Sequence, residues 1–319
     1  MYQTVKRKEG FMRAKGIESV LNILPVRLRN SILGEQPDFG KLQEIRLRAG
    51  QPVTLKYDGR ERIVGRPSCG GITMEEIQET VQYAADYSLY AYEQEMRQGY
   101  LTVEGGHRVG MAGQVILDGR QIRNLRYISS INIRIAHEIH GCADGALPFL
   151  IQAGDVLNTL IIAPPGCGKT TLLRDIIRRI SNGSEYLDGK NVGVVDERSE
   201  IGGSYMGVPQ NDLGSRTDVL DACPKAEGMM MLVRSMGPQV IAVDELGSME
   251  EVQILKYAMC CGCRTLATVH GASWQEIRGK PMFQDFFIQK MFQRYLVLCD
   301  VKHPGLIEGI YDEQGEKVC

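Results

Sequence analysis

The residues best suited to chemistry stand within positions 160–171, where an apolar run leads into a turn rich in proline and glycine that ends in Gly-Lys-Thr. A buried strand, a glycine-rich loop and a helix in this order form a cradle for phosphate, because backbone N–H groups and the helix N-terminus face the phosphate oxygens. We therefore predict a nucleotide-binding loop, made of Pro165, Gly166, Cys167, Gly168, Lys169, Thr170 and Thr171.

Two side chains of this loop have expected roles in catalysis. Lys169 is placed to reach the β- and γ-phosphates, and the Thr170 hydroxyl is placed to ligate Mg²⁺. Ala163 stands where the usual pattern has its first glycine, and a small residue is sufficient there because the position ends a strand. A glycine-rich turn without a ligand is the alternative interpretation.

A pair of carboxylates, Asp244 and Glu245, follows the apolar run 240–243. Strands buried on both faces of a parallel sheet have such continuous apolar runs, and functional groups stand just beyond their carboxyl ends. We expect Asp244 to hold Mg²⁺ together with Thr170, and Glu245 to polarise the attacking water as the catalytic carboxylate. Alternatively, the pair opens the helix that follows.

The apolar run 191–195 ends in a dense charged cluster, Asp-Glu-Arg-Ser-Glu at 196–200. If this strand lies in the same parallel sheet, its end lies beside the nucleotide, and Glu197 becomes a catalytic candidate. A solvated turn, in which Arg198 pairs with Asp196 and Glu197, is equally consistent with the sequence.

The run 264–269 ends at His270. By the same argument His270 or Thr268 could contact the γ-phosphate, so His270 is a further catalytic candidate. A histidine after a strand also serves as a structural hydrogen-bonding residue, and this alternative stays open.

Motifs of other nucleotide-binding classes are absent from the sequence. No Asn-Lys-x-Asp follows the loop, so guanine specificity is not expected, and there is no Leu-Ser-Gly-Gly transporter signature. The spacing of glycines does not match the dinucleotide fingerprint either. ATP is the nucleotide that this pattern predicts, and ATP hydrolysis the reaction.

The elements that position these residues alternate along 141–319. Apolar runs predict strands and amphipathic patterns predict helices. The expected strands cover 159–163, 191–195, 239–243 and 264–269, and the expected helices 170–181, 225–235 and 249–260. This alternation predicts an α/β fold, a P-loop core with a parallel sheet and helices on both faces. Residues 201–224, rich in Gly, Asp and Ser, predict a long functional loop.

Residues 1–140 predict a smaller α+β N-terminal domain with an antiparallel sheet and a basic arm at its start. Its expected elements are helices over 17–33, interrupted near Pro25, and over about 74–97, with strands over 42–48 and 53–57. A turn at 50–52 connects the two strands, and Asp58-Gly59 predicts a hairpin turn after the second. The domain boundary is expected after residue 140.

Composition narrows the choice of partners. The formal net charge is −2 and 43% of the 319 residues are apolar, which predicts a globular protein without a nucleic-acid partner. No apolar run approaches the roughly 20 residues that span a bilayer, so we expect no direct membrane insertion. The nine cysteines have no disulfide-framework spacing, which indicates reduced thiols and a cytoplasmic protein.

These segments together resemble the type II/type IV secretion traffic ATPases, a ring-forming branch of RecA-like motors. The resemblance rests on the phosphate loop, on 196–200 as an acidic box, on Thr268-Val269-His270 as a histidine box, and on 232–238 before the second acidic strand. It implies a homo-hexamer. One difference is that Asp244 stands where the family usually has a glycine before the catalytic glutamate of the second acidic strand. It also implies an arginine donated by a neighbouring subunit, for which the candidates are Arg108, Arg134, Arg198, Arg216 and Arg234.

A narrower resemblance is to the branch of this family found in endospore-forming bacteria. It covers nearly the whole chain, on the segments 44–48, 105–110, 128–136, 195–201, 216–221 and 223–229. The resemblance implies a sporulation motor on the mother-cell side, which acts at the membrane through channel proteins of a trans-envelope complex. A nucleotide-gated scaffold with little hydrolysis, or a RecA-like nucleic-acid motor, are the alternatives.

Overall fold

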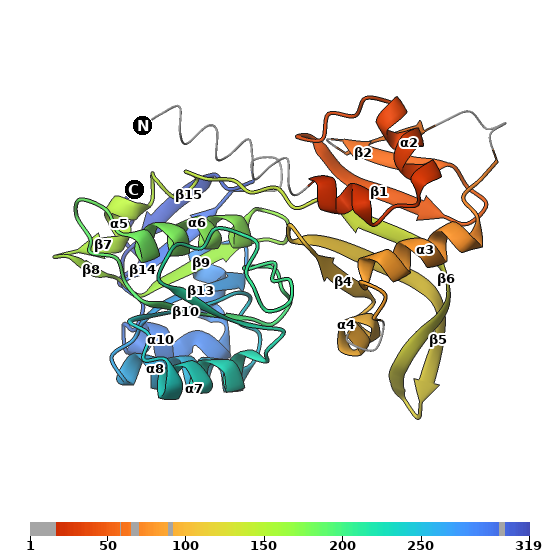
Figure 1. Cartoon of the computed structure of the whole chain (residues 1–319). Helices are drawn as coiled ribbons and strands as arrows, with labels where there is room; N and C mark the ends of the chain where they lie inside the picture. Colours follow the sequence, from red (N-terminus) through yellow and green to blue (C-terminus); the bar gives the residue numbers. More distant parts are fainter. Residues whose placement is uncertain (1–16, 58, 65–69, 89–91, 300–303) are drawn as a thin grey trace. The chain divides into compact units, whose positions relative to one another are not determined.

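The structure is a computed structural model that describes residues 17–57, 59–64, 70–88, 92–299 and 304–319. Its contacts divide the chain into two units (Figure 1). Unit 1 contains the described residues up to His137 together with Gly203–Gln210, and unit 2 contains Glu138–Gly202 and Asn211–Cys319. The basic arm and Asp58 of the expected hairpin turn lie outside the described residues. The division into functional domains at residue 140 stays a prediction.

Unit 1 is built on a six-stranded antiparallel sheet with strand order β3-β2-β1-β6-β5-β4. The strands are β1 (Leu42–Arg48), β2 (Val53–Tyr57), β3 (Arg60–Val64), β4 (Tyr100–Val103), β5 (His107–Asp118) and β6 (Gln121–Arg134). The helix α2 (Val26–Gly34) follows Pro25, and its buried Leu28 and Ile32 join the core of the sheet. An apolar face on one side of a sheet requires such a cover, which explains the helix pattern in the sequence.

The long helix expected over about 74–97 is wrong. The structure has two helices there, α3 (Met74–Ala84) and α4 (Glu93–Gln98). A capping box between Thr73 and Glu76 starts α3 as its sequence suggests. Asp86 and Tyr87 then adopt left-handed backbone conformations, with φ of 45° and 57°, and these cannot continue a right-handed helix.

Unit 2 contains a seven-stranded sheet with order β11-β10-β12-β13-β9-β14-β15. All neighbours are parallel except β14 and β15. The strands are β9 (Thr159–Ala163), β10 (Val192–Asp196), β11 (Thr217–Asp221), β12 (Val240–Val243), β13 (Arg264–His270), β14 (Arg294–Leu298) and β15 (Ile307–Tyr311). A small hairpin of β7 (Ile151–Gln152) and β8 (Asp155–Val156) precedes them.

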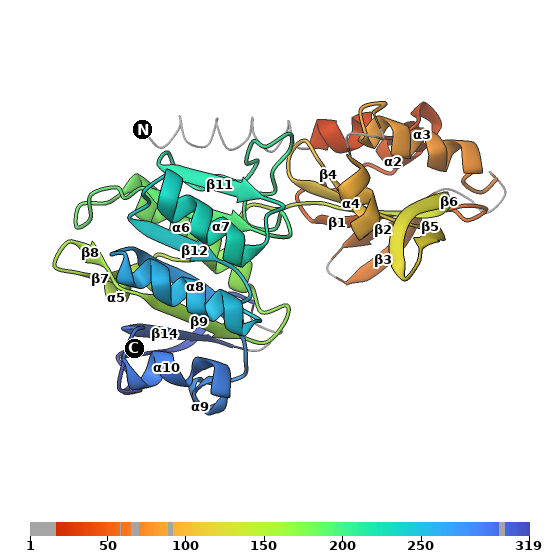
Figure 2. The same cartoon turned by 90° about the horizontal axis from the view of Figure 1, so that it is seen from below.

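Helices cover both faces of this sheet (Figure 1). The helix α6 (Lys169–Asn182) packs on one face, where Ile161, Val194 and Ala242 point. On the other face, α7 (Lys225–Ser235) and α8 (Met249–Cys260) lie side by side (Figure 2), over Ile162 and Val195. Neighbouring residues of each strand thus enter different cores, which is why the strands are continuously apolar.

The remaining helices of unit 2 are short. They are α5 (Leu147–Leu150), α9 (Trp274–Gly279), the 3₁₀ helix η3 (Pro281–Phe283) and α10 (Gln284–Ile288). Across the described parts of the chain, no helix combines the length and apolarity needed to cross a membrane.

The expectation of a continuous loop over 201–224 is wrong for its last third. Residues Thr217–Asp221 form β11, which pairs in parallel with β10 at the edge of the sheet. Its residues are half-exposed or exposed, unlike those of the fully buried β10. An edge strand with one polar face lacks the apolar run by which the other strands were predicted.

Candidate active site

The register of the sheet brings the predicted motifs to one edge. Strand β13 lies between β9 and β12, with Ala163 of β9 opposite His270 and Val243 of β12 opposite Ala267. The phosphate loop continues from Ala163, and the two carboxylates continue from Val243. Because all three strands are parallel, their carboxyl ends meet where α6 begins.

The phosphate loop has the backbone that its glycines predict. Gly166 and Gly168 have φ of 79° and 86°, in the region that only glycine adopts without strain. The first hydrogen bond inside α6 runs from Leu172 N to Gly168 O, 3.0 Å, so the amide groups before it point out of the helix end. A hydrogen bond from Gly305 N to Cys167 O, 2.8 Å, joins the loop to the segment that follows β14.

Lys169 is buried and lies in a cluster of charges with Glu245. Its Nζ lies 3.0 Å from His270 Nδ1 and 3.7 Å from Glu245 Oε1. An ammonium group only donates, so Nδ1 accepts and His270 carries its proton on Nε2, which lies 2.8 Å from Glu245 Oε1. The other oxygen of Glu245 accepts from Arg198 Nη1 at 3.0 Å. The structure therefore joins three of the predicted catalytic residues directly.

Asp244 is buried beside this cluster. Thr170 Oγ1 donates to its Oδ2 at 2.5 Å, and Thr268 Oγ1 donates to its Oδ1. Burial raises the pKa of Asp244, against the two hydroxyl bonds and Lys169, which lower it. Thr170 and Asp244, predicted to share a metal, are thus in direct contact.

The donor set fits Mg²⁺. The hydroxyl of Thr170 and the carboxylate of Asp244 are hard oxygen donors, and Mg²⁺ is commonly held by one or two such groups together with substrate phosphates. Among the described residues, no cluster of three or more His, Cys, Asp or Glu side chains could hold a metal by itself. A metal at this site would therefore need the phosphates as partners.

The acidic cluster after β10 divides into two parts. Asp196 is buried and accepts hydrogen bonds from the backbone N–H groups of Glu200, Ile201 and Gly202 at 2.8–2.9 Å. Burial raises its pKa to about 6, although these three bonds lower it. The buried Asp196 side chain thus stabilises the turn over 196–202 through these hydrogen bonds.

Glu197 forms an ion pair with Lys225. Its Oε2 lies 2.7 Å from Lys225 Nζ, and Lys225 also lies 3.3 Å from Glu251 Oε1. The structure does not bring Glu197 into contact with Glu245, and its catalytic role stays a prediction.

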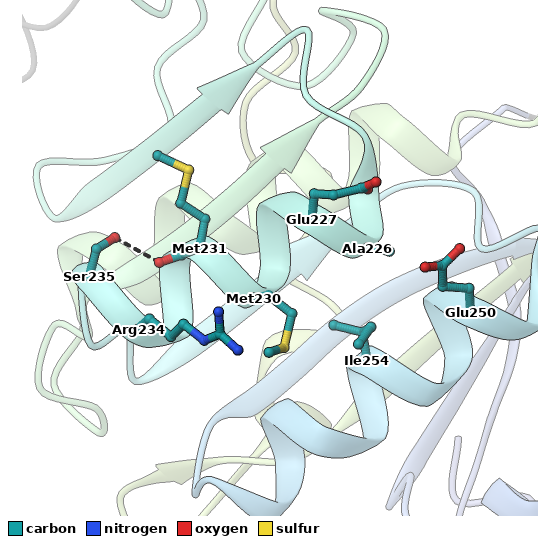
Figure 3. Close-up of a pocket in the computed structure, with 8 residues that line it drawn as sticks. All are labelled: Ala226, Glu227, Met230, Met231, Arg234, Ser235, Glu250 and Ile254. Carbon is teal, nitrogen blue, oxygen red and sulfur yellow. Dashed lines mark hydrogen bonds between the residues drawn. The ribbon is translucent and has the colours of Figure 1, made fainter.

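Arg234 lies in the last turn of α7, which ends just before β12 begins. It is therefore at the amino edge of the sheet, opposite the phosphate loop. There it lines a groove of about 510 Å³ between α7 and α8, with Glu227, Met230 and Ile254 (Figure 3). Arg234 thus lies at the edge away from Lys169, and its catalytic role stays a prediction.

Three of the other arginine candidates have local partners. Arg198 contacts Glu245, and Arg216 Nη1 donates to Ser181 O at 3.1 Å. In unit 1, Arg108 lies over the ring of Tyr100, 3.9 Å from its centroid, and Arg134 ends β6. Of the contacts just given, that of Arg198 is with a predicted catalytic side chain.

Two contacts of the site were not predicted from the sequence. Thr268 was expected as a phosphate contact, whereas its hydroxyl bonds Asp244. Gly305, near the start of the described range 304–319, packs against Gly168 and was not predicted. The Pro304-Gly305 pair beyond an apolar strand was the available signal, because turns at carboxyl ends of parallel strands gather at the site.

Known structures share this fold. An ATPase named DotB from Legionella pneumophila superposes with a TM-score of 0.55, over 80% of this chain and 72% of that one, at 14% identity. The pilus retraction motor PilT superposes with a TM-score of 0.56, over 84% and 76%, at 16% identity. The fold is therefore that of the RecA-like secretion ATPases, with a parallel P-loop core and an antiparallel N-terminal sheet, as predicted.

Sequence comparison gives the narrower relationship. The chain belongs to the family described as Sporulation stage III, protein AA, whose model matches residues 14–318. It is 42% identical over 301 residues to Stage III sporulation protein AA of Bacillus subtilis (strain 168), covering 94% of this chain and 96% of that one. The resemblance stated from the sequence is confirmed.

Proposed function

We propose that this chain is a Mg²⁺-dependent ATPase of the secretion-motor type. The observation that supports the proposal best is the contact of Thr170 with Asp244, 2.5 Å, beside the cluster of Lys169 and Glu245. Lys169 and Thr170 begin α6, whereas Asp244 and Glu245 follow β12, and each side chain is the type that phosphoryl transfer requires. The PilT structure that shares the fold is described with bound ADP.

Binding of the nucleotide rests on the loop and on Lys169. The amide groups before Leu172 and the positive end of α6 attract phosphate oxygens, and Lys169 adds a buried positive charge. Thr170 and Asp244 would hold Mg²⁺, which supplies charge neutralisation on the phosphates when it is bound. Cys167 is fully buried in the loop, and we assign it no chemistry.

Glu245 is the group that acts on water. In the structure its carboxylate is held by three cationic or donating groups, Arg198, His270 and Lys169. Anionic phosphates compete with Glu245 for Lys169 and Arg198, so nucleotide binding would free carboxylate oxygens to accept a proton from the attacking water. Such proton transfer contributes typically about 10²–10⁴-fold to a rate.

We further propose that the chain works as a homo-hexamer, in which a neighbouring copy supplies an arginine to the site in addition to the chain's own Arg198. Arg234 is a candidate because it lies at the opposite edge of the sheet. The ring would act on the mother-cell side of a membrane through channel proteins of a sporulation complex, since the family is one of sporulation proteins.

Two variants test the proposal. Lys169→Met removes the buried cation and should abolish ATP binding. Glu245→Gln keeps the shape of the side chain and should bind ATP normally while turnover falls by about 10²-fold or more. Glu250→Gln, in the exposed first turn of α8, is the matched control and should keep both properties.

Hydrolysis unchanged in Glu245→Gln would contradict the assignment of the carboxylate. Normal ATP binding without turnover in the unaltered chain would favour a nucleotide-gated scaffold. Turnover that depends on added DNA would favour a nucleic-acid motor.

A further inference from the structure

We propose that Thr268 is a positioning residue that clamps the two carboxylates Asp244 and Glu245 in place for hydrolysis. This inference rests on the proposed function for its effect on turnover, although the clamp itself can be tested without ATP. Thr268 belongs to β13, the strand between the phosphate-loop strand β9 and the carboxylate strand β12. It is fully buried.

Thr268 contacts three consecutive residues across the sheet edge. Its hydroxyl donates to Asp244 Oδ1 and accepts from Glu245 N at 2.9 Å. Its main-chain oxygen accepts from Leu246 N, also at 2.9 Å. One threonine therefore holds the side chain of Asp244 and the backbone on both sides of the Glu245 Cα atom.

The direction of these bonds is fixed by the number of protons. A threonine hydroxyl has one proton, and a carboxylate can only accept, so that proton goes to Asp244. The lone pairs of the Thr268 hydroxyl oxygen then accept the hydrogen bond from the N–H group of Glu245. Valine has the same shape and can make neither bond, whereas serine can make both.

The clamp explains the backbone of Glu245. This residue has φ of +55°, a left-handed conformation that is unfavourable for a side chain other than glycine. Such conformations persist only where the surroundings hold them, and here both flanking amide groups are held by Thr268. The left-handed turn in this way directs Glu245 toward Lys169 and His270, with which it makes contact.

Removal of the hydroxyl should therefore loosen Glu245 and leave the phosphate loop intact. For Thr268→Val we expect the kcat for ATP hydrolysis to fall about 10- to 100-fold, because a misplaced catalytic group loses this much, while the KM for ATP stays within about threefold. Thr268→Ser should recover most of the loss. Thr265→Val is the matched control, since Thr265 is buried in the same strand and its hydroxyl has no hydrogen-bond partner within the described structure.

A double variant separates positioning from general damage. If Thr268 acts in part through Glu245, then Thr268→Val should cause a smaller loss of turnover in the Glu245→Gln background than in the unaltered chain, because only its hold on Asp244 is left to lose. An additional loss of the same size in that background would overturn the proposal, as would full turnover of Thr268→Val in the otherwise unaltered chain.

Hydrogen exchange tests the clamp independently of ATP. In Thr268→Val the Glu245 amide should exchange at least about tenfold faster, while the Leu246 amide, bound to the main chain of Thr268, should change little. Unchanged exchange at Glu245 overturns the proposal. If the unaltered chain does not hydrolyse ATP but Glu245 exchange responds as expected, the proposed function fails and the clamp stands.

Discussion

A close backbone approach in the phosphate loop, between Gly168 and Gly305, predicts the effect of a substitution. Gly168 has φ of +86°, and a Cβ atom added to it would lie 2.8 Å from Gly305 N and 3.3 Å from Gly305 Cα. Both obstacles are backbone atoms, which cannot turn aside as a flexible side chain does. We therefore expect Gly168→Ala to damage both stability and ATP binding.

The size of the effect has two parts. A left-handed conformation costs a residue with a side chain roughly 1–2 kcal/mol. Overpacking against a well-packed neighbour typically costs about 1–3 kcal/mol more. The free energy of unfolding of unit 2 should thus fall by about 2–5 kcal/mol, unless the loop moves away from Gly305 and loses its cradle instead.

The chain carries its own probe for this measurement. Trp274 is the single tryptophan of the sequence. It is only 7% exposed and belongs to a hydrophobic core of unit 2. Its fluorescence during urea unfolding reports on unit 2. Gly145→Ala is the control, because its added Cβ meets no atom within 4 Å and should change stability by less than about 0.5 kcal/mol. Unfolding and ATP affinity of Gly168→Ala that both match those of the unaltered chain would refute the reasoning.

Three further predictions concern unit 2. Burial raises the pKa of Asp196 to about 6, so between about pH 4 and pH 6 the folded state keeps a proton that the unfolded chain has lost. Stability should fall as the pH rises through that window, and Asp196→Asn should remove this slope; a slope that persists in the variant contradicts the assignment. Cys167 is fully buried, so alkylation should be slow in the folded protein and should abolish ATP binding once achieved, whereas normal affinity after proven alkylation would exclude the loop placement. Thr265→Val replaces a buried hydroxyl that has no hydrogen-bond partner among the described residues, and it should leave urea stability unchanged or raise it by up to about 1 kcal/mol; a clear loss would indicate a partner for that hydroxyl.

The core of unit 2 was predictable because its strands are buried on both faces. Runs such as 159–163 and 240–243 are apolar throughout, and the sheet places them at its centre. The polar groups that end these runs identify the carboxyl edge of the sheet. From that edge alone the contact of Thr170 with Asp244 could be expected, and the structure contains it.

Other features depend on contacts between distant residues, which no local pattern encodes. Edge strand β11 has little apolar surface to bury, so its sequence is typical of a loop. Thr268 and His270 have their partners because β13 lies between β9 and β12. The order of strands in a sheet cannot be predicted from the sequence of any single segment. The burial of Asp196 likewise follows from the turn that folds over it. The catalytic roles of these residues stay predictions.

The most direct test of the account is ATP turnover by the purified chain and its Glu245→Gln variant, over a series of protein concentrations, with ATP binding measured in the same samples. The account predicts that both bind ATP, that turnover per chain rises with concentration as rings assemble, and that the variant is nearly inactive at every concentration. Turnover of the variant equal to that of the unaltered chain would contradict the account, because Glu245 would then have no part in the reaction.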